Sequence, residues 1–181
     1  EARARPRHRG LTGPMATFAP WPQPVLARPA EPVGDIDDRV RAIWNQMVAA
    51  MRATPGIVGL AAPQLGHSIR LAVADCSETR DAPLRLADPE ILWASDEMRT
   101  HREGSPHLPG LAAELVRPAR IRLAFTDETG KRVERDFEGL WSTCLQHQID
   151  HLEGRMFFER LSRLKRDRLV AKHLKRMKRG A

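Results

Sequence analysis

The residues from 120 to 154 constrain the fold most, because they combine a strand pattern and a helix pattern in one short stretch. The sequence RIRLAFTDETGKRVERDFEG alternates apolar and polar residues on both sides of Glu128-Thr129-Gly130, which is the pattern of a β-hairpin. A helix is expected from about residue 140 to 152, ending at Gly154. An antiparallel hairpin that leads into a helix predicts an α+β fold.

Other segments add strands and two further helices. Residues 69–76 and 84–94 are predicted strands, the second interrupted at Asp88-Pro89. The proline-rich residues 16–35 are expected to form an extended surface arm. An apolar stripe at spacings of three and four predicts a helix over 36–53, made by Ile36, Val40, Ile43, Met47 and Met51. A basic C-terminal helix, about 160–180, is expected to turn inward Leu161, Leu164, Val170, Leu174 and Met177.

The composition is that of a globular protein with one domain, expected at 15–181. The chain has 181 residues, of which 41% are hydrophobic and 29% charged, and no apolar run approaches the ~20 residues of a membrane span. The two cysteines, Cys76 and Cys144, are too few for a disulfide framework and favour a reducing compartment. We therefore expect a cytoplasmic monomer without a membrane segment.

The net charge of +7 is concentrated at the two ends of the chain. Residues 160–181 contain ten Lys or Arg and one acid, Asp167, while the first ten residues contain four Arg. Such a run is either a solvated helix face or a contact for a polyanion. Residues 1–14 lack apolar periodicity and are expected to be a disordered basic leader or an over-extended start, with a transit peptide as the less favoured alternative.

Two histidines, His147 and His151, are four residues apart in the predicted helix, within the sequence TCLQHQIDHLEG. Side chains at i and i+4 project from one face, so two imidazoles could bind one metal ion. Hydrolases with a His-Glu-x-x-His helix use this geometry, but Gln148 occupies the position of the glutamate. Spacing alone leaves open a ligand pair or two histidines packed in a helix. Asp150 could hydrogen-bond a ring N–H of His151 or lie on the helix surface.

Three motifs resemble those of the peptide deformylase family in their order and separation. They are GLAAPQLG at 59–66, REGSPHLPG at 102–110 and QHQIDHLEG at 146–154, where the family has G-x-G-L-A-A-P-Q, E-G-C-L-S and Q-H-E-x-D-H. The resemblance runs from about Met15 to the basic C-terminus. It implies a deformylase-like α+β fold, with antiparallel strands around a central metal-site helix and helices at both ends.

The resemblance also implies an activity and roles for several residues. The family hydrolyses the formyl group from the N-terminal Met of nascent chains with a divalent metal such as Fe²⁺, Zn²⁺ or Ni²⁺. By resemblance, Gly59 and Leu60 would bind the substrate, and Gln64 would donate its side-chain amide to the formyl oxygen. Glu103 would pair with a basic residue, for which Arg117 is our candidate. His147 and His151 would be metal ligands.

The sequence departs from the family pattern at two positions that the chemistry needs. Ser105 stands where the family has its metal-binding Cys, and a serine hydroxyl stays protonated near neutral pH, whereas a thiolate binds such metals well. Gln148 stands where the family has its general base. An amide can orient water but cannot take its proton, and general acid–base assistance contributes roughly 100- to 10,000-fold. Both changes predict weak metal occupancy and weak catalysis.

A third departure lies beside the first. The family uses the backbone N–H after the Cys to hold the oxyanion, and Pro106 at that position has no N–H. Loss of one oxyanion donor typically costs about 100- to 1,000-fold in rate. His107, two residues after Ser105, could supply a third nitrogen ligand and restore a three-His metal site.

Three functions stay open at this point. The first is a deformylase-family protein whose activity is lost or strongly reduced, with a cleft that keeps an N-formyl-methionyl peptide or another small acyl ligand. The second is an active metal amidohydrolase with a rebuilt His-rich site. The third is a ribosome- or RNA-associated binding module without catalysis, because bacterial deformylases are similar in docking a C-terminal helix near the nascent-chain exit and this helix is basic.

Overall fold

The computed structural model describes residues 17–179, and the expected leader at 1–14 lies outside them. Its α-helices are α1 (Asp38–Ala53), α2 (Gly139–Leu152) and α3 (Arg163–Arg179). Its strands are β1 (Gly59–Ala61), β2 (Leu71–Ala74), β3 (Leu84–Ala94), β4 (Met98–Gly104), β5 (Ala112–Pro118), β6 (Arg120–Thr126) and β7 (Arg132–Glu138). Short 3₁₀ turns are η1 (Pro24–Leu26), η2 (Ala62–Leu65) and η3 (Phe157–Arg160). The predicted α+β class is confirmed.

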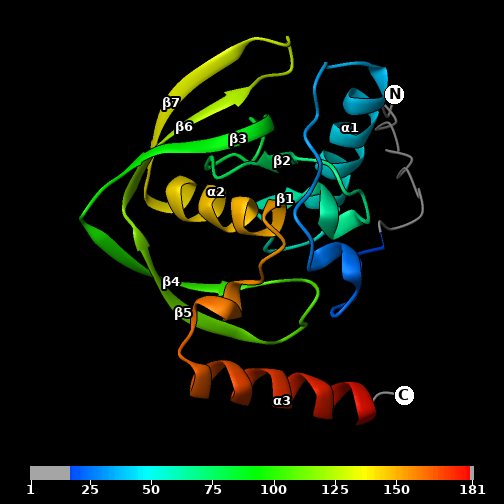
Figure 1. Cartoon of the computed structure of the whole chain (residues 1–181), viewed down its shortest axis with the longest axis vertical. Coiled ribbons are helices and arrows are strands. Elements are labelled where there is room, and N and C mark those ends of the chain that lie inside the picture. The colour runs from blue at the N-terminus through cyan, green and yellow to red at the C-terminus, as the bar shows by residue number, and fades with distance from the viewer. Residues whose placement is uncertain (1–16, 180–181) are drawn as a thin grey trace, which may run out of the picture.

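The strands form two antiparallel sheets. One has five strands in the order β1-β2-β3-β6-β7, and the other is the ribbon of β4 and β5. The chain bends from β3 into β4 and from β5 into β6 at adjacent points, so the ribbon continues the large sheet at an angle (Figure 1). Ser95 fixes this bend, because its hydroxyl accepts from Arg120 N (3.0 Å) and donates to Glu97 O (2.9 Å).

Helix α2 lies between the five-stranded sheet and the ribbon, at the centre of the molecule (Figure 1). The predicted hairpin is confirmed as β6 and β7, with Thr126 opposite Arg132. Its turn is held by Asp127, whose Oδ1 accepts from the backbone N–H groups of Thr129 (2.9 Å) and Lys131 (3.1 Å). Gly130 has a φ of 85° there, a left-handed conformation that glycine adopts without strain. The hairpin delivers the chain directly into α2.

Strands β1 and β2 are buried on both faces, because each face is covered by a helix. Successive side chains of a strand point to opposite faces. Leu60, Leu71 and Val73 therefore pack against α1, while Ala61, Ala72 and Ala74 belong to the cluster around α2. Small side chains on the α2 side let this helix approach the sheet closely.

The predicted helix is confirmed as α1, but it begins at Asp38, two residues later than expected. The carboxylate of Asp37 accepts from Val40 N at 2.8 Å and caps the helix start. Its buried stripe covers the outer face of the sheet and consists of Val40, Ile43, Trp44, Met47, Val48, Ala50 and Met51.

Two strand predictions need correction. Strand β3 is not interrupted at Asp88-Pro89: it continues through residues 84–94, with register shifts against β6 and a φ of 47° at Asp88. Strands β4 and β5 were not predicted. Their inward-facing positions include His101, Glu103 and Arg117, so no hydrophobic alternation marks them in the sequence.

The prediction for the C-terminal helix was right about its existence and about Leu161 and Val170, which pack inward, and wrong about the other three apolar residues. Leu164, Leu174 and Met177 are 61%, 43% and 48% exposed. Helix α3 lies at the end of the molecule beyond the ribbon (Figure 1) and packs through the buried His173 and the half-buried Leu169 and Val170. Arg176 adds a hydrogen bond to Pro109 O at 3.1 Å. Most other side chains of α3 are exposed in the structure of residues 17–179.

The N-terminal segment is more than a surface arm. Its side chains Ala19 and Leu26 are buried beside the ribbon, and Ala30 packs into the cluster around α2. Its backbone also makes contacts, since Ala19 N donates to Gln64 O at 2.9 Å. Across residues 17–179, no helix is long and apolar enough to cross a membrane.

Candidate active site

Helix α2 carries the candidate active site and is buried along most of its length. Because it passes between the sheet and the ribbon, polar side chains on it are removed from water and need partners inside the protein. The partners come from strands β4 and β5, from the segment that follows β1 and from the segment that precedes β5.

The two histidines face one another on α2. The Nε2 atoms of His147 and His151 are 3.1 Å apart. Nδ1 of His147 lies 2.8 Å from Oε2 of Glu103; a carboxylate can only accept, so this nitrogen carries the hydrogen. Burial lowers the pKa of His151 well below its ordinary value, which keeps the ring neutral. A neutral imidazole is the form that binds a metal.

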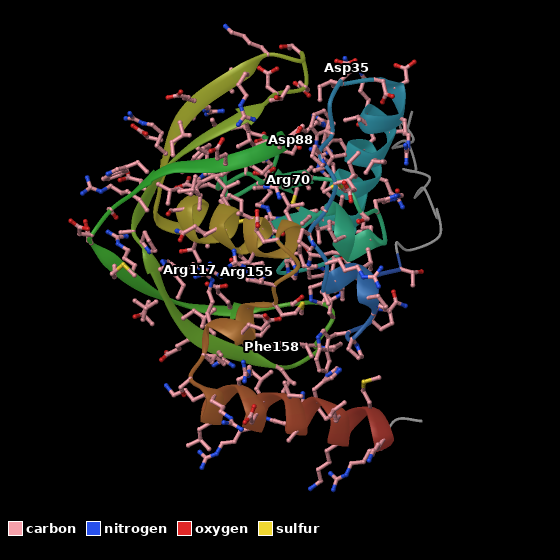
Figure 2. All side chains as sticks on the ribbon, in the orientation of Figure 1. Asp35, Arg70, Asp88, Arg117, Arg155 and Phe158 are labelled. Carbon is pink, nitrogen blue, oxygen red and sulfur yellow. The ribbon has the colours of Figure 1, made fainter. Side chains whose placement is uncertain are left out.

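Behind the histidines lies a buried cluster of charges (Figure 2 shows Arg117 between α2 and the ribbon). Arg117 is 1% exposed and binds both oxygens of Glu103, with distances of 2.6 and 2.8 Å. Its Nη1 also donates to Asp150 at 2.9 Å. Arg160 donates to both oxygens of Asp150. Two arginines and two carboxylates therefore balance one another, and Arg117 is the basic partner of Glu103 that was expected.

The role of Asp150 differs from both expectations. Its carboxylate is buried and engages Arg117 and Arg160, so it neither holds a ring nitrogen of His151 nor lies on the helix surface. Glu103, on the neighbouring ribbon, orients the other histidine, His147. Nδ1 of His151 is buried and has no partner within residues 17–179.

Gln64 and His107 form a second network on the opposite side of the site. Oε1 of Gln64 accepts from Ala61 N at 2.8 Å, and its Nε2 lies 3.0 Å from Nε2 of His107. Nδ1 of His107 contacts the carbonyl oxygen of Ala19. One tautomer satisfies every contact: the amide of Gln64 donates to His107, whose Nδ1–H donates to Ala19. Both ring nitrogens of His107 are then in use, and its ring centroid is 5.7 Å from that of His151.

Three residues that differ from the expected motifs lie around the histidines: Ser105, Pro106 and Gln148. Oγ of Ser105 and Oε1 of Gln148 are buried without a hydrogen-bond partner in the described chain. Pro106 lines the cleft beside them. Buried polar atoms without partners are uncommon in folded proteins and mark positions where a ligand or solvent completes the bonding.

A cleft of about 170 Å³ opens onto this group of residues. One wall is residues 56–59 and another is residues 101–104, with α2 as the floor. Gly59 is required there, because a Cβ would lie 2.5 Å from Sγ of Cys144 and 3.0 Å from Nε2 of Gln148. The side chain of Leu60 is fully buried against α1, so a contact of this residue with substrate would have to use its backbone.

The donor set fits a divalent metal only in part. Two imidazole nitrogens 3.1 Å apart can share an ion that binds each at about 2.0–2.1 Å. Within residues 17–179, however, no group of three His, Cys, Asp or Glu side chains is placed to hold a metal. The remaining nearby donor, the hydroxyl of Ser105, is a weak ligand while protonated. Hydrolytic metal centres use three protein ligands, so this arrangement lacks one.

As pH falls, stability is expected to be lost in two stages, first through the buried histidines His107 and His151 and then through Glu103. Burial lowers the pKa of His107 from 6.5 to about 4. The unfolded chain therefore takes up this proton first, and stability is lost as pH falls from 6.5 to 4. Burial raises the pKa of Glu103, but hydrogen bonds from Arg117 and His147 outweigh it and lower the pKa from 4.5 to about 2. Its contribution, of order 3 kcal/mol, is lost between pH 4.5 and 2.

Urea unfolding between pH 7.5 and 3 measures this dependence. The control is His107→Asn, which removes one titrating ring and should reduce the slope between pH 6.5 and 4, while the share from His151 and the slope at lower pH remain. An upper slope that is unchanged in this variant would show that His107 does not contribute to it.

Sequence reasoning missed two residues of the site. Arg160 was counted as part of the basic C-terminal run, although it binds Asp150; nothing in that run distinguishes it. His101 lines the cleft from β4, and no signal in the sequence pointed to it because the strand itself was not predicted.

The fold and the histidine helix define an α+β protein of the metal-hydrolase type. The model of the polypeptide deformylase family matches residues 15–167, and the chain belongs to that family. The family is one of metal-dependent hydrolases that use a divalent ion.

Named relatives span nearly the full length. A peptide deformylase of Bartonella tribocorum is 40% identical over 169 residues, covering 91% of this chain and 94% of that protein. A protein of Bradyrhizobium diazoefficiens named peptide deformylase-like is 42% identical over 173 residues, covering 94% of this chain and 100% of that protein. The crystal structure of the Ehrlichia chaffeensis deformylase in complex with actinonin has a TM-score of 0.83 and 32% identity, covering 90% of this chain and 97% of that one.

Proposed function

We propose that this protein binds the formylated N-terminus of a peptide, or another small acyl ligand, and that its deformylase activity is lost or strongly reduced. The observation that carries the proposal is the incomplete donor set: His147 and His151 are aligned, and no third residue of the usual ligand types joins them within residues 17–179. Two imidazoles alone are too few ligands for a hydrolytic metal centre, which uses three from the protein.

The residues around the histidines support loss of the chemical step. Gln148 lies where the family's base is expected, and its amide has no protonation equilibrium near neutral pH. Pro106 has no N–H to offer a developing oxyanion. Ser105 leaves the metal without its thiolate. These three functions act as a unit, so their losses do not simply add.

The cleft supports retained binding of an extended chain. Within residues 17–179, β1 is the edge of the five-stranded sheet and β4 pairs with β5 alone, so each strand has one edge without a strand partner there. Residues from both strands line the cleft. An extended peptide between two free strand edges can hydrogen-bond to the backbone on both sides. The relative solved with actinonin holds that ligand, which supports the presence of a binding cleft in this fold.

An active, rebuilt metal site is the less favoured alternative. It needs His107 as a ligand, but both ring nitrogens of His107 are occupied by Gln64 and Ala19. Recruiting it would break two buried hydrogen bonds, each a net cost of about 0.5–1.5 kcal/mol.

Calorimetric titration with formyl-Met-Ala-Ser tests the proposal, with Met-Ala-Ser as the matched control. We expect saturable binding of the formylated peptide and weaker binding of the other. Mass spectrometry of the same sample should show the formyl group still attached after prolonged incubation. Absence of binding, or complete deformylation, contradicts the proposal.

We further propose the ribosome as a partner, contacted through α3. This helix holds nine Lys or Arg and one acid, and only His173 on it is buried. Its exposed cations suit a polyphosphate surface, and such binding weakens steeply with salt.

Co-sedimentation with ribosomes measures this contact. Deleting residues 165–181 should abolish salt-sensitive pelleting, and so should changing the exposed Arg168, Lys172 and Lys175 to Glu, which keeps the packing residues of α3. Unchanged pelleting of both variants would remove the ribosome from the proposal.

A further inference from the structure

His101 is one of the polar residues that line the cleft. It belongs to β4, on the same face as Glu103, because the two are separated by one residue and strand side chains alternate. The cross-strand partner of His101 is the buried Leu115, so this is the inward face of the ribbon. His101 thus lines the cleft from the inward face of β4.

The floor of the cleft is one face of α2. Leu140, Thr143 and Cys144 line the cleft at spacings of three and four, which place them on the same side of the helix. Val58 adds another apolar side chain. The space between His101 and this face of α2 suits a side chain of a ligand. His101 adds an imidazole ring that can hydrogen-bond to that side chain.

One ring nitrogen of His101 lacks a hydrogen-bond partner. This atom, Nε2, is buried and makes no hydrogen bond with any residue in 17–179. Glu103, the nearest carboxylate on the same face, has both oxygens engaged by Arg117 and one also by His147. A buried ring nitrogen without a partner is costly unless something that enters the cleft completes its bonding.

We infer that His101 selects the first side chain of the ligand, favouring one of methionine length that ends in a hydrogen-bond-accepting oxygen over methionine itself. Methionine sulfoxide and glutamine are examples of this class. The inference rests on the proposed binding of a formylated N-terminus in this cleft.

An acceptor is favoured because Nε2 of the ring can donate to it in the protonated form and in one of the two neutral tautomers. A neutral imidazole carries its hydrogen on either nitrogen, and the protonated ring donates from both. A donor group on the ligand could be accepted only by the neutral tautomer whose Nε2 carries no hydrogen. The cleft volume of about 170 Å³ corresponds to roughly five or six water-sized groups, enough for such a side chain.

Binding constants for matched formylated peptides test the inference. The probes are formyl-Met-Ala-Ser, the same peptide with methionine sulfoxide, and the same peptide with norleucine, an apolar residue of equal length. We expect the sulfoxide peptide to bind the protein about tenfold or more tightly than the other two. His101→Leu should reverse the order, and His101→Gln, which keeps a donor, should retain part of the preference.

Equal binding of the three peptides to the protein, or an unchanged sulfoxide preference in His101→Leu, overturns the inference and leaves the proposed function intact. Failure of all three peptides to bind either the protein or His101→Leu overturns the proposed function, and this inference with it. Circular dichroism of both variants should match the unsubstituted protein.

Discussion

Replacing Arg117 with alanine is expected to lower the free energy of unfolding by about 3 to 5 kcal/mol. The guanidinium is 1% exposed and contacts both Glu103 and Asp150. Its removal leaves Glu103 as a buried carboxylate without a cationic partner, and Asp150 with Arg160 alone. Urea unfolding at pH 7 measures the change.

A matched control is Arg122→Ala, which removes an exposed ion pair with Asp136 on the hairpin. Exposed pairs contribute little because water screens them, so its unfolding midpoint should stay close to that of the unsubstituted protein. A loss below about 1 kcal/mol for Arg117→Ala would mean that the buried charges relax into solvent. The buried cluster of Arg117, Glu103 and Asp150 would then not be what keeps Glu103 in position to orient His147.

The combined substitution Ser105→Cys, Pro106→Leu and Gln148→Glu is expected to create deformylase activity. It supplies a thiolate ligand, a backbone N–H and a general base around His147 and His151. The base alone contributes roughly 100- to 10,000-fold and the oxyanion donor about 100- to 1,000-fold. Formate release from formyl-Met-Ala-Ser should therefore rise by at least about 100-fold over the unsubstituted protein.

The control for that gain is the same triple variant carrying His147→Ala. It should lose both the gained activity and the bound metal, whose stoichiometry is measured by atomic absorption. Ser105→Cys alone should raise metal occupancy without comparable formate release. A triple variant that binds one metal and stays inactive would show that the cleft itself excludes the formyl group.

The sequence predicted the elements whose patterns are local. The β6–β7 hairpin, α1 and α2 follow from alternation, helical spacing and turn residues within short windows. The ribbon did not follow, because β4 and β5 turn charged residues inward, and Glu103 and Arg117 are stable there only as partners of one another. Local hydrophobicity cannot show such pairing.

The sequence likewise predicted the part of the candidate site that depends on local spacing and missed the part that depends on distant residues. The histidine pair is set by helix geometry and was predictable from spacing. The engagement of His107 by Ala19 depends on residues 88 positions apart in the chain, and the binding of Asp150 by Arg160 depends on the turn after α2. The exposed apolar residues of α3, such as Leu164, were assigned inward because helical spacing identifies a stripe but not whether another element covers it.

The most direct test of the central claim is formate release from formyl-Met-Ala-Ser by the unsubstituted protein. The protein is loaded anaerobically with Fe²⁺, Ni²⁺, Co²⁺ or Zn²⁺, and His147→Ala treated in the same way is the blank. We predict no release above the blank with any of the metals. Turnover at ordinary enzymatic rates, lost in His147→Ala, would contradict the account and show that Ser105, Pro106 and Gln148 belong to a working site.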